Sequence, residues 1–282
     1  MPGTVTAAVT DLPAIDRHAL DAIAALCQRA VVDPPTVQEL ELALFAPEQP
    51  AVIRGDPSVG VVATVECEDG AHVRLLVVDP AHRGKGHGHV LLHAAEDDAR
   101  ATGRTALTTG ADPPFYLWPG VPSTEIAMLC LLERHHYTRV EANFDMRVDL
   151  ASIPDDPGGH DLAIADERDE IGEWFSKHWA SWRLEGLRAF DKGNLVVCRD
   201  DAGISAICAF EVNRSGLLGP MAVRPDVVGR GRGKPALLGA LHELRRRGRD
   251  HVDVCWVGPI APYAAVGGRV SNVYFVYRRE LR

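Results

Sequence analysis

The sequence predicts an α/β (α+β) protein made of two similar halves, and three observations carry this prediction. The chain has 282 residues, which suits two domains of about 140 residues each. It contains two glycine-rich stretches of the same shape, VDPAHRGKGHG over 78–88 and VRPDVVGRGRG over 223–233. Each stretch stands between an apolar segment and an amphipathic one. Because Pro225 follows Pro80 by 145 residues (225 − 80), about half the chain, the pattern indicates an internal duplication.

The first half places two strands before its glycine stretch and a helix after it. Residues 64–80, TVECEDGAHVRLLVVDP, read as a hairpin around the Asp69-Gly70 turn. Over 89–103, HVLLHAAEDDARATG has apolar residues at helical spacing and ends on glycine. The segment TALTT (105–109) predicts a short strand.

The second half repeats this order. Residues 198–223 predict two strands, KPALLGALHELRRRG (234–248) predicts a helix that ends at Gly248, and HVDVC (251–255) predicts a short strand.

The halves also end alike. RVEANFDMRVDL (139–150) and RVSNVYFVYRREL (269–281) each predict an apolar strand pair, and the intervening ASIPDDPGGH has the composition of a linker. The longer first half carries an insertion around PPFYLWPGVPSTEI (113–126). We therefore expect an N-terminal domain over 1–150, a linker over 151–160 and a C-terminal domain over 161–282.

Composition predicts a cytoplasmic globular protein. Apolar residues make up 46% of the chain, with no run of about 18 that would cross a membrane. The N-terminus MPGTVTAAVTDLPAID lacks the basic and apolar regions of a secretory signal. Six scattered cysteines show no C-x-x-C spacing, which predicts buried free thiols.

The charge balance excludes a nucleic-acid partner. The net charge is −9 and the pI is about 5.7, so a polyanion would be repelled. The basic run RRRGR (245–249) falls at the end of a predicted helix, where cations suit the helix dipole. An acidic protein with basic glycine loops instead suits an anionic cofactor combined with a cationic co-substrate.

A glycine loop between a strand and a helix is suited to binding an anion. It brings bare backbone and the helix N-terminus to the ligand, and here the glycines alternate with Lys85 and His87, or with Arg230 and Arg232. A tight turn that binds nothing is the alternative. A Walker loop is excluded because Pro235 follows Gly233-Lys234, and the glycine spacing does not fit a dinucleotide fold.

The loops resemble the signature of the GNAT superfamily of acetyl-CoA-dependent N-acyltransferases, R/Q-x-x-G-x-G/A after a strand that ends V-x-P. The segment Arg83–Gly88 fits at every position, whereas the second loop fits at Gly231 and Gly233 but has Val228 in place of the Arg or Gln. The resemblance implies two tandem GNAT-like domains, each a mixed, mostly antiparallel sheet flanked by helices. It also implies acetyl-CoA as cofactor, with its pyrophosphate on the loop amides and its pantetheine arm along the preceding strand. The implied cofactor residues are Leu76, Val77, Val78, Arg83, Gly84, Lys85, Gly86, His87 and Gly88 in the first half, and Ala222, Val223, Gly229, Arg230, Gly231, Arg232 and Gly233 in the second.

GNAT enzymes often take their general acid from a tyrosine in the pattern Y-x-x-x-G-F. Tyr263 to Gly267 match it, with Gly268 in place of the Phe. The first half has Leu132 at the tyrosine position and His136 at the glycine position. The better cofactor loop and the better acid therefore lie in different halves.

The general base has three candidates. Glu211 ends a predicted strand, Asp253 lies on the next, and His72 stands where some GNAT members carry a catalytic Glu. A water chain is the alternative to all three.

Three aromatic residues are candidates for a substrate wall: Tyr116, Trp118 and Trp256. For the insertion that holds the first two, with Phe115, the alternative is that it covers the first sheet. His89 and His93 lie one helical turn apart, but no acidic or Cys ligand is evident beside them, so no metal site is predicted.

These observations predict an enzyme that moves the acetyl group of acetyl-CoA to a primary amine of a small molecule, by direct attack. The alternative is a non-catalytic acetyl-CoA-binding sensor or scaffold in at least one half. Acylation of protein lysines is disfavoured because no segment indicates a long peptide groove.

Overall fold

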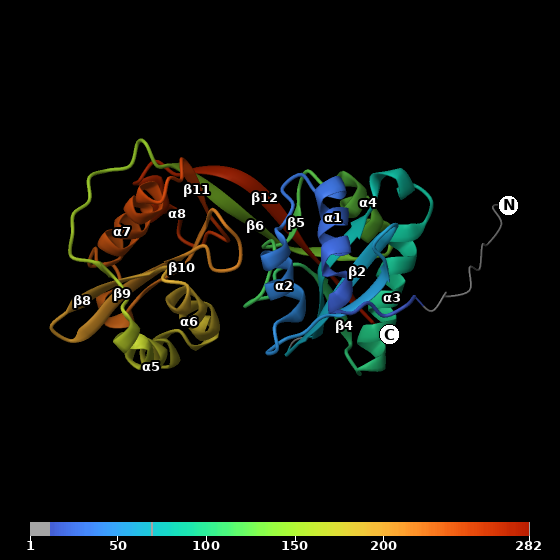
Figure 1. The fold of residues 1–282 in the computed structure, drawn as a ribbon, viewed down its shortest axis with the longest axis horizontal. Helices are drawn as coiled ribbons and strands as arrows, with labels where there is room; N and C mark the ends of the chain where they lie inside the picture. Colours follow the sequence, from blue (N-terminus) through green and yellow to red (C-terminus); the bar gives the residue numbers. More distant parts are fainter. Residues whose placement is uncertain (1–11, 69, 282) are drawn as a thin grey trace. The chain divides into compact units, whose positions relative to one another are not determined.

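The computed structural model describes residues 12–68 and 70–281, and the chain divides into two compact units (Figure 1). Unit 1 runs to Ala142 and includes the C-terminal segment from Tyr274, whereas unit 2 is Asn143–Val273. Residues 1–11, which entered the signal-peptide argument, and Asp69 of the predicted hairpin turn lie outside the described residues. Within the described residues, no helix combines the length and apolar character needed to span a bilayer.

Unit 1 is a mixed sheet between two layers of helices. Strands β1, β2 and β3 pair antiparallel, β3 pairs parallel with β4, and β4 and β5 pair antiparallel with β12. Apolar side chains on one face pack against α1 and α2, and those on the other face pack against α3 and α4. The elements are α1 (Leu20–Ala30), α2 (Val37–Phe45), β1 (Val52–Asp56), β2 (Gly60–Cys67), β3 (Gly70–Val78), α3 (His87–Ala101), β4 (Ala106–Thr109), β5 (Val121–Pro122), α4 (Ile126–Arg134), the start of β6 (Thr138–Asp149) and the end of β12 (Arg269–Glu280).

Unit 2 repeats this architecture, with α7 and α8 on one face and α5 and α6 on the other (Figure 1). Its strand order is β6-β11-β10-β9-β8-β7, in which the β10–β11 pair is parallel and the other pairs are antiparallel. The elements are β7 (Asp161–Leu162), α5 (Arg168–His178), α6 (Arg183–Asp191), β8 (Leu195–Asp200), β9 (Gly203–Phe210), β10 (Leu217–Val223), α7 (Gly233–Arg246), β11 (His251–Val254) and α8 (Ile260–Ala264). The predicted fold class, two mixed and mostly antiparallel sheets flanked by helices, is confirmed.

The two units exchange their closing strands, which the sequence analysis did not anticipate. Residues 274–281 lie in unit 1, whereas the prediction placed them in the C-terminal domain. β12 pairs with β4 of unit 1, and β6 pairs with β11 of unit 2. Each is 12 residues long and passes from one unit into the other.

Two further sequence expectations are corrected. The segments 139–150 and 269–281 were expected to form strand pairs, but each forms one continuous strand because no turn residue interrupts it. Not all cysteines are buried. Cys27, Cys198 and Cys208 are buried, whereas Cys130 lies exposed on α4.

Candidate functional site

The two glycine loops have the same backbone conformation. Each begins with a single 3-10 turn after a proline, Pro80–His82 or Pro225–Val227. Gly84 and Gly86 have φ of 75° and 90°, and Gly229 and Gly231 have φ of 79° and 76°. These left-handed values are strained for a side chain, although a Cβ at any of the four would meet no atom within 4 Å. The glycines therefore satisfy the backbone, and the loop surface stays open to a ligand.

The third glycine of each loop has a different role, which is close packing. A Cβ on Gly233 would lie 2.7 Å from Met221 Cε and 3.0 Å from Val223 Cγ2. A Cβ on Gly88 would lie 3.2 Å from a Leu131 methyl carbon. Each therefore lets the first turn of the helix approach its neighbours, and the turn's amides, which have no acceptor inside the helix, face the loop. With the exposed Lys85, Arg230 and Arg232 nearby, both loops provide what a phosphate needs.

The strand before each loop has an edge that its parallel neighbour leaves uncovered. β3 pairs with β2 as far as Val78, but its parallel pairing with β4 covers only Ala71–Val73. β10 pairs with β11 only at Leu217 and Leu218. An extended ligand arm can therefore pair with the rest of either edge.

The hydrogen-bond pattern shows which peptide groups face this edge. Asp79 N donates to Val59 O on the β2 side, and Arg224 N donates to Ser205 O on the β9 side. Since antiparallel pairing alternates, the peptide groups of Val78 and Val223 point to the opposite edge. The peptide groups of Leu76 also point to the uncovered edge. Those of Val77 point to β2, and those of Ala222 point to β9. Leu76, Val78 and Val223 thus direct their peptide groups to the uncovered edge.

One carbonyl on this edge receives a side-chain donor in both units, from different residues. In unit 1 the signature arginine donates from Arg83 Nε to Val78 O over 3.1 Å, and from Arg83 Nη2 to the α1 carbonyl of Ala30 over 2.8 Å. In unit 2, where Val228 replaces this arginine, Trp179 Nε1 donates to Val223 O over 3.1 Å. Trp179 follows α5, the first helix of unit 2. Each unit therefore links its first helix to the strand before its glycine loop, through Arg83 in unit 1 and through Trp179 in unit 2.

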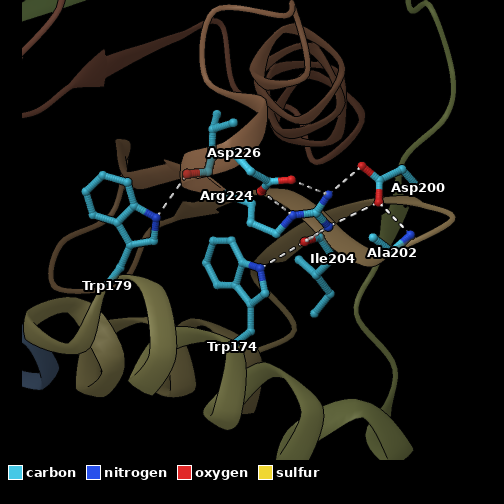
Figure 2. Close-up of polar contacts among 8 residues, drawn as sticks. Trp174, Trp179, Asp200, Ala202, Ile204, Arg224 and Asp226 are labelled. Carbon is cyan, nitrogen blue, oxygen red and sulfur yellow. Dashed lines mark hydrogen bonds and ion pairs between the residues drawn. The ribbon is translucent and has the colours of Figure 1, made fainter.

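Figure 2 shows the surroundings of this link. Arg224, directly after Val223, forms ion pairs with Asp200 at 2.9 Å and with Asp226 at 2.7 Å. It also donates to Ile204 O, as does Trp174 Nε1. The hydrogen bonds from Arg224 lower the pKa of both carboxyl groups. This network fixes the end of β10 where the loop begins.

The two units carry different residues directly after the last parallel pair of β3 with β4 and of β10 with β11. In unit 1 this residue is Arg74, whose buried guanidinium pairs with buried Asp112 and lies 5.7 Å from the centre of the Phe115 ring. In unit 2 the equivalent residue is Gly219, and a Cβ there would be 3.5 Å from Cys255 Sγ. In unit 1 the side chains of Arg74 and Asp112 fill this position, whereas unit 2 has no side chain there.

Tyr263 of unit 2 contacts β10 at Met221, two residues after Gly219. It is buried on α8, and its hydroxyl donates to Met221 Sδ on β10 over 3.9 Å. Burial, with smaller contributions from Cys208 and Cys255, raises the pKa of Tyr263 above its usual value. The phenol therefore keeps its proton at neutral pH. Gly268 stands where the Y-x-x-x-G-F pattern has Phe, and a Cβ there would be 2.7 Å from Tyr263 O.

The equivalent segment of unit 1 makes a similar turn but has no tyrosine at the position of Tyr263. His136 has φ of 60° where Gly267 has 89°, and Tyr137 N donates to Leu132 O as Gly268 N donates to Tyr263 O. Leu132 is fully buried in the apolar core. The sequence alignment of the two segments therefore matches the structure, and unit 1 has an aliphatic side chain at the acid position.

The three candidate bases are engaged elsewhere. Glu211 has φ of 49°, accepts from Gly216 N and pairs with Arg249 at 2.5 Å. Asp253 pairs with Arg147 at 2.6 Å and accepts from Ser271 Oγ. His72 is buried, with Nδ1 3.1 Å from Gly110 O. These contacts favour structural roles for all three.

The aromatic candidates divide between packing and exposure. Phe115 and Tyr116 are buried, and Trp118 packs on the core that faces α1 and α2. This favours the alternative in which the insertion covers the first sheet. Trp256 is half-buried with φ of 50°, and its N donates to Asp145 Oδ1 over 3.0 Å.

Comparison with known proteins identifies the fold. Residues 42–116 match the family described as Acetyltransferase (GNAT) domain. A tandem GNAT protein from the clavulanic acid biosynthesis pathway superposes with a TM-score of 0.68 at 18% identity, covering 93% of this chain and 94% of that one. The chain is a tandem GNAT-fold protein.

Two other solved structures share this tandem GNAT fold. One is a GCN5-related N-acetyltransferase from Sphaerobacter thermophilus, with TM-score 0.67, 20% identity and coverage of 95% of both chains. The other is the GCN5-related glucosamine N-acetyltransferase region of a fungal multi-domain GH3 β-N-acetylglucosaminidase, with TM-score 0.77 and 21% identity. That match covers 95% of this chain, which spans 38% of the fungal chain. No curated protein matches the sequence.

Sequence reasoning missed several residues of this tandem GNAT fold. The difference between Arg74 and Gly219 could have been found from the sequence, because the 145-residue offset between the loops aligns these two residues. The link from Trp179 could not have been found, because nothing local shows that a residue 44 positions before Val223 reaches its carbonyl.

Proposed function

We propose that the chain transfers the acetyl group of acetyl-CoA to a primary amine of a small molecule, and that the transfer takes place in unit 2. One observation carries the proposal. The hydroxyl of Tyr263 lies on Met221 of β10, in the unit whose parallel pairing ends at a glycine. A proton donor and a strand edge open to a ligand thus occur together.

Both loops fit the anionic end of acetyl-CoA. The open surface over Gly229 and Gly231 and the first-turn amides of α7 would hold the pyrophosphate, aided by Arg230 and Arg232. The uncovered edge of β10 up to Val223 would pair with the pantetheine arm. Bound acetyl-CoA supplies an activated thioester.

Tyr263 is proposed as the general acid. Its buried phenol holds a proton at neutral pH, and we infer that this proton passes to the thiolate sulfur that leaves as the amine attacks. Breaking the sulfur–carbonyl bond leaves negative charge on sulfur, and the phenolic proton neutralises it.

A water chain is proposed to take the proton of the attacking ammonium. Glu211 and Asp253 are tied to Arg249 and Arg147, and His72 belongs to unit 1. Water reaches an exposed strand edge without any of these ion pairs breaking.

Unit 1 is proposed as a non-catalytic cofactor-binding or scaffold half, which keeps the second candidate function for this part of the chain. Its loop carries the complete signature, but Leu132 stands at the acid position and Arg74 with Asp112 fills the position where the strands part. Binding without turnover follows from these two side chains.

The test is a screen of amines with detection of the free thiol of released CoA. Amino sugars enter first, because the fungal region of the same fold is a glucosamine N-acetyltransferase region. We expect amine-dependent CoA release. Saturable acetyl-CoA binding by calorimetry, with no release for any amine class, would instead support the sensor function.

A further inference from the structure

Three histidines of unit 1 gather where α3 begins and α4 ends. His89 and His93 lie one turn apart on α3, and His135 follows the last residue of α4. Nδ1 of His89 is 2.8 Å from Nε2 of His135, and the three ring centroids are 4.4–5.0 Å apart. One nitrogen of each ring lies within 4.8 Å of the other two. The sequence prediction of no metal site considered only the pair on α3, since His135 lies more than 40 residues further along.

The buried carboxylate of Glu96 lies next to this cluster. Glu96 is fully buried, and its Oε1 accepts from Tyr137 at 3.1 Å and from Arg279 at 2.7 Å. Its Oε2 has no hydrogen-bond donor among the described residues, and it lies 3.4 Å from Nδ1 of His93 and 3.5 Å from Nη2 of Arg100. A carboxylate in this place holds a proton on Nδ1 and leaves Nε2 with its lone pair, which is how metal-bound histidines are commonly oriented.

The two nearest ring nitrogens of the cluster are Nδ1 of His89 and Nε2 of His135, 2.8 Å apart. Neutral imidazoles are metal ligands, and only one proton fits between the two nitrogens of His89 and His135. A metal ion that replaces this shared proton would accept a lone pair from each of the two nitrogens, and the proton would move to the other nitrogen of one ring.

We propose that His89, His93 and His135 bind one divalent transition-metal ion of the Zn²⁺ class. Three nitrogen ligands suit Zn²⁺, Co²⁺ or Ni²⁺, whereas Mg²⁺ and Ca²⁺ take oxygen. Ligand nitrogens in a tetrahedral site with Zn–N of about 2.0–2.1 Å lie about 3.3 Å apart, so His89 and His135 need to separate by only about half an ångström. Three protein ligands leave a fourth position for water or another ligand.

The site is independent of the proposed acetyl transfer, because its ligands belong to unit 1. An ion there joins the end of α4 to the first turn of α3, just after the glycine loop. Its primary effect is therefore to stabilise unit 1, which gives a readout that needs no substrate.

The test uses the full chain, free of tags and stripped with a chelator. We expect Zn²⁺ to bind one per chain by calorimetry, to raise the melting temperature, and to compete with Co²⁺ that shows the visible absorption of a four-coordinate site. His89→Gln changes an exposed residue and so spares folding, and it should weaken Zn²⁺ binding about 100-fold or more, as should His135→Gln.

The matched control is His82→Gln, which changes a histidine of the same loop region that contacts His87 and lies outside the cluster. This variant should bind Zn²⁺ as the unmodified chain does. The proposal is overturned if the chain takes up no stoichiometric Zn²⁺, or if His89→Gln binds it equally well.

Discussion

Units 1 and 2 share an architecture but carry different side chains at three equivalent positions, and at one of these, Gly219, the backbone differs as well. Arg74 of unit 1 corresponds to Gly219 of unit 2, Leu132 to Tyr263, and Arg83 to Val228. In unit 1 the first two side chains are buried, one in an ion pair and one in the apolar core. In unit 2 the same two positions are a glycine and a proton donor. The loop glycines, which the backbone conformation requires, occur in both units.

This difference supports the proposal that the two units have different roles. A substitution at a left-handed glycine strains the loop in either unit, so the loops keep their glycines. Gly219 is also held at a positive φ, 142°, whereas unit 1 has the buried Arg74 at the equivalent position and the buried Leu132 at the position of Tyr263. Unit 2 lacks the arginine, and there Trp179 donates to the equivalent carbonyl, that of Val223.

The largest kinetic effect is expected at the acid position. Tyr263→Phe keeps the ring and removes the proton, so kcat should fall about 10²–10⁴-fold while the affinity for acetyl-CoA changes little. Steady-state kinetics with calorimetry measures both. Tyr137→Phe in unit 1, which loses a hydrogen bond to Glu96, is the matched control and should keep its kcat. Equal rates in both variants would remove Tyr263 from the mechanism.

A large effect on stability without an effect on kcat is expected at Arg74. Arg74→Met leaves the Asp112 carboxylate buried without its partner, which typically costs about 3–5 kcal/mol in the free energy of unfolding. Chemical denaturation measures the loss. Arg54→Met breaks a more exposed pair with Asp98 and should cost about 1 kcal/mol or less. If Arg74→Met also abolished kcat in the folded protein, unit 1 would be the catalytic half.

A smaller effect is expected at the link that replaces the signature arginine. Trp179→Phe leaves Val223 O without its indole donor, and a neutral hydrogen bond contributes about 0.5–1.5 kcal/mol. The Kd of acetyl-CoA should therefore rise about 2–10-fold by calorimetry. Trp182→Phe alters the ring stacked on Trp179 at 5.0 Å without touching that carbonyl, and it should bind normally. Equal loss in both variants would assign the effect to the stack.

The smallest effect is expected in how the melting temperature depends on pH. Hydrogen bonds from Arg224 lower the pKa of Asp200 and Asp226 in the folded state, and one from Arg29 lowers the pKa of Asp79 in unit 1. Because the folded values lie below the unfolded value of about 3.9, these groups stabilise the fold above that pH, and the stabilisation is lost as the pH falls through the folded values. Arg224→Met should therefore lower the melting temperature by about 1–2 °C more at pH 6 than at pH 3. An equal decrease at both pH values would contradict this linkage.

Much of the fold was predictable because it depends on local chemistry. The loop glycines, the helices that follow them and the alignment of Leu132 with Tyr263 all follow from spacing along the chain. The exchange of β6 and β12 was not predictable, since two strands of similar sequence specify no choice between two similar edges. The link from Trp179 and the cluster of His135 with His89 depend on contacts between distant segments, and one-dimensional periodicity carries no information about these.

The central claim, that acetyl transfer takes place in unit 2, is tested most directly by blocking the two loops in turn. Gly86→Glu and Gly231→Glu place the same carboxylate at matched left-handed positions, with φ of 90° and 76°. The charge repels phosphate, and the strain is similar in both variants. Turnover at saturating amine should fall at least about 100-fold in Gly231→Glu and stay near the unmodified rate in Gly86→Glu. Loss of turnover in Gly86→Glu with retention in Gly231→Glu would contradict the account and place the chemistry in unit 1.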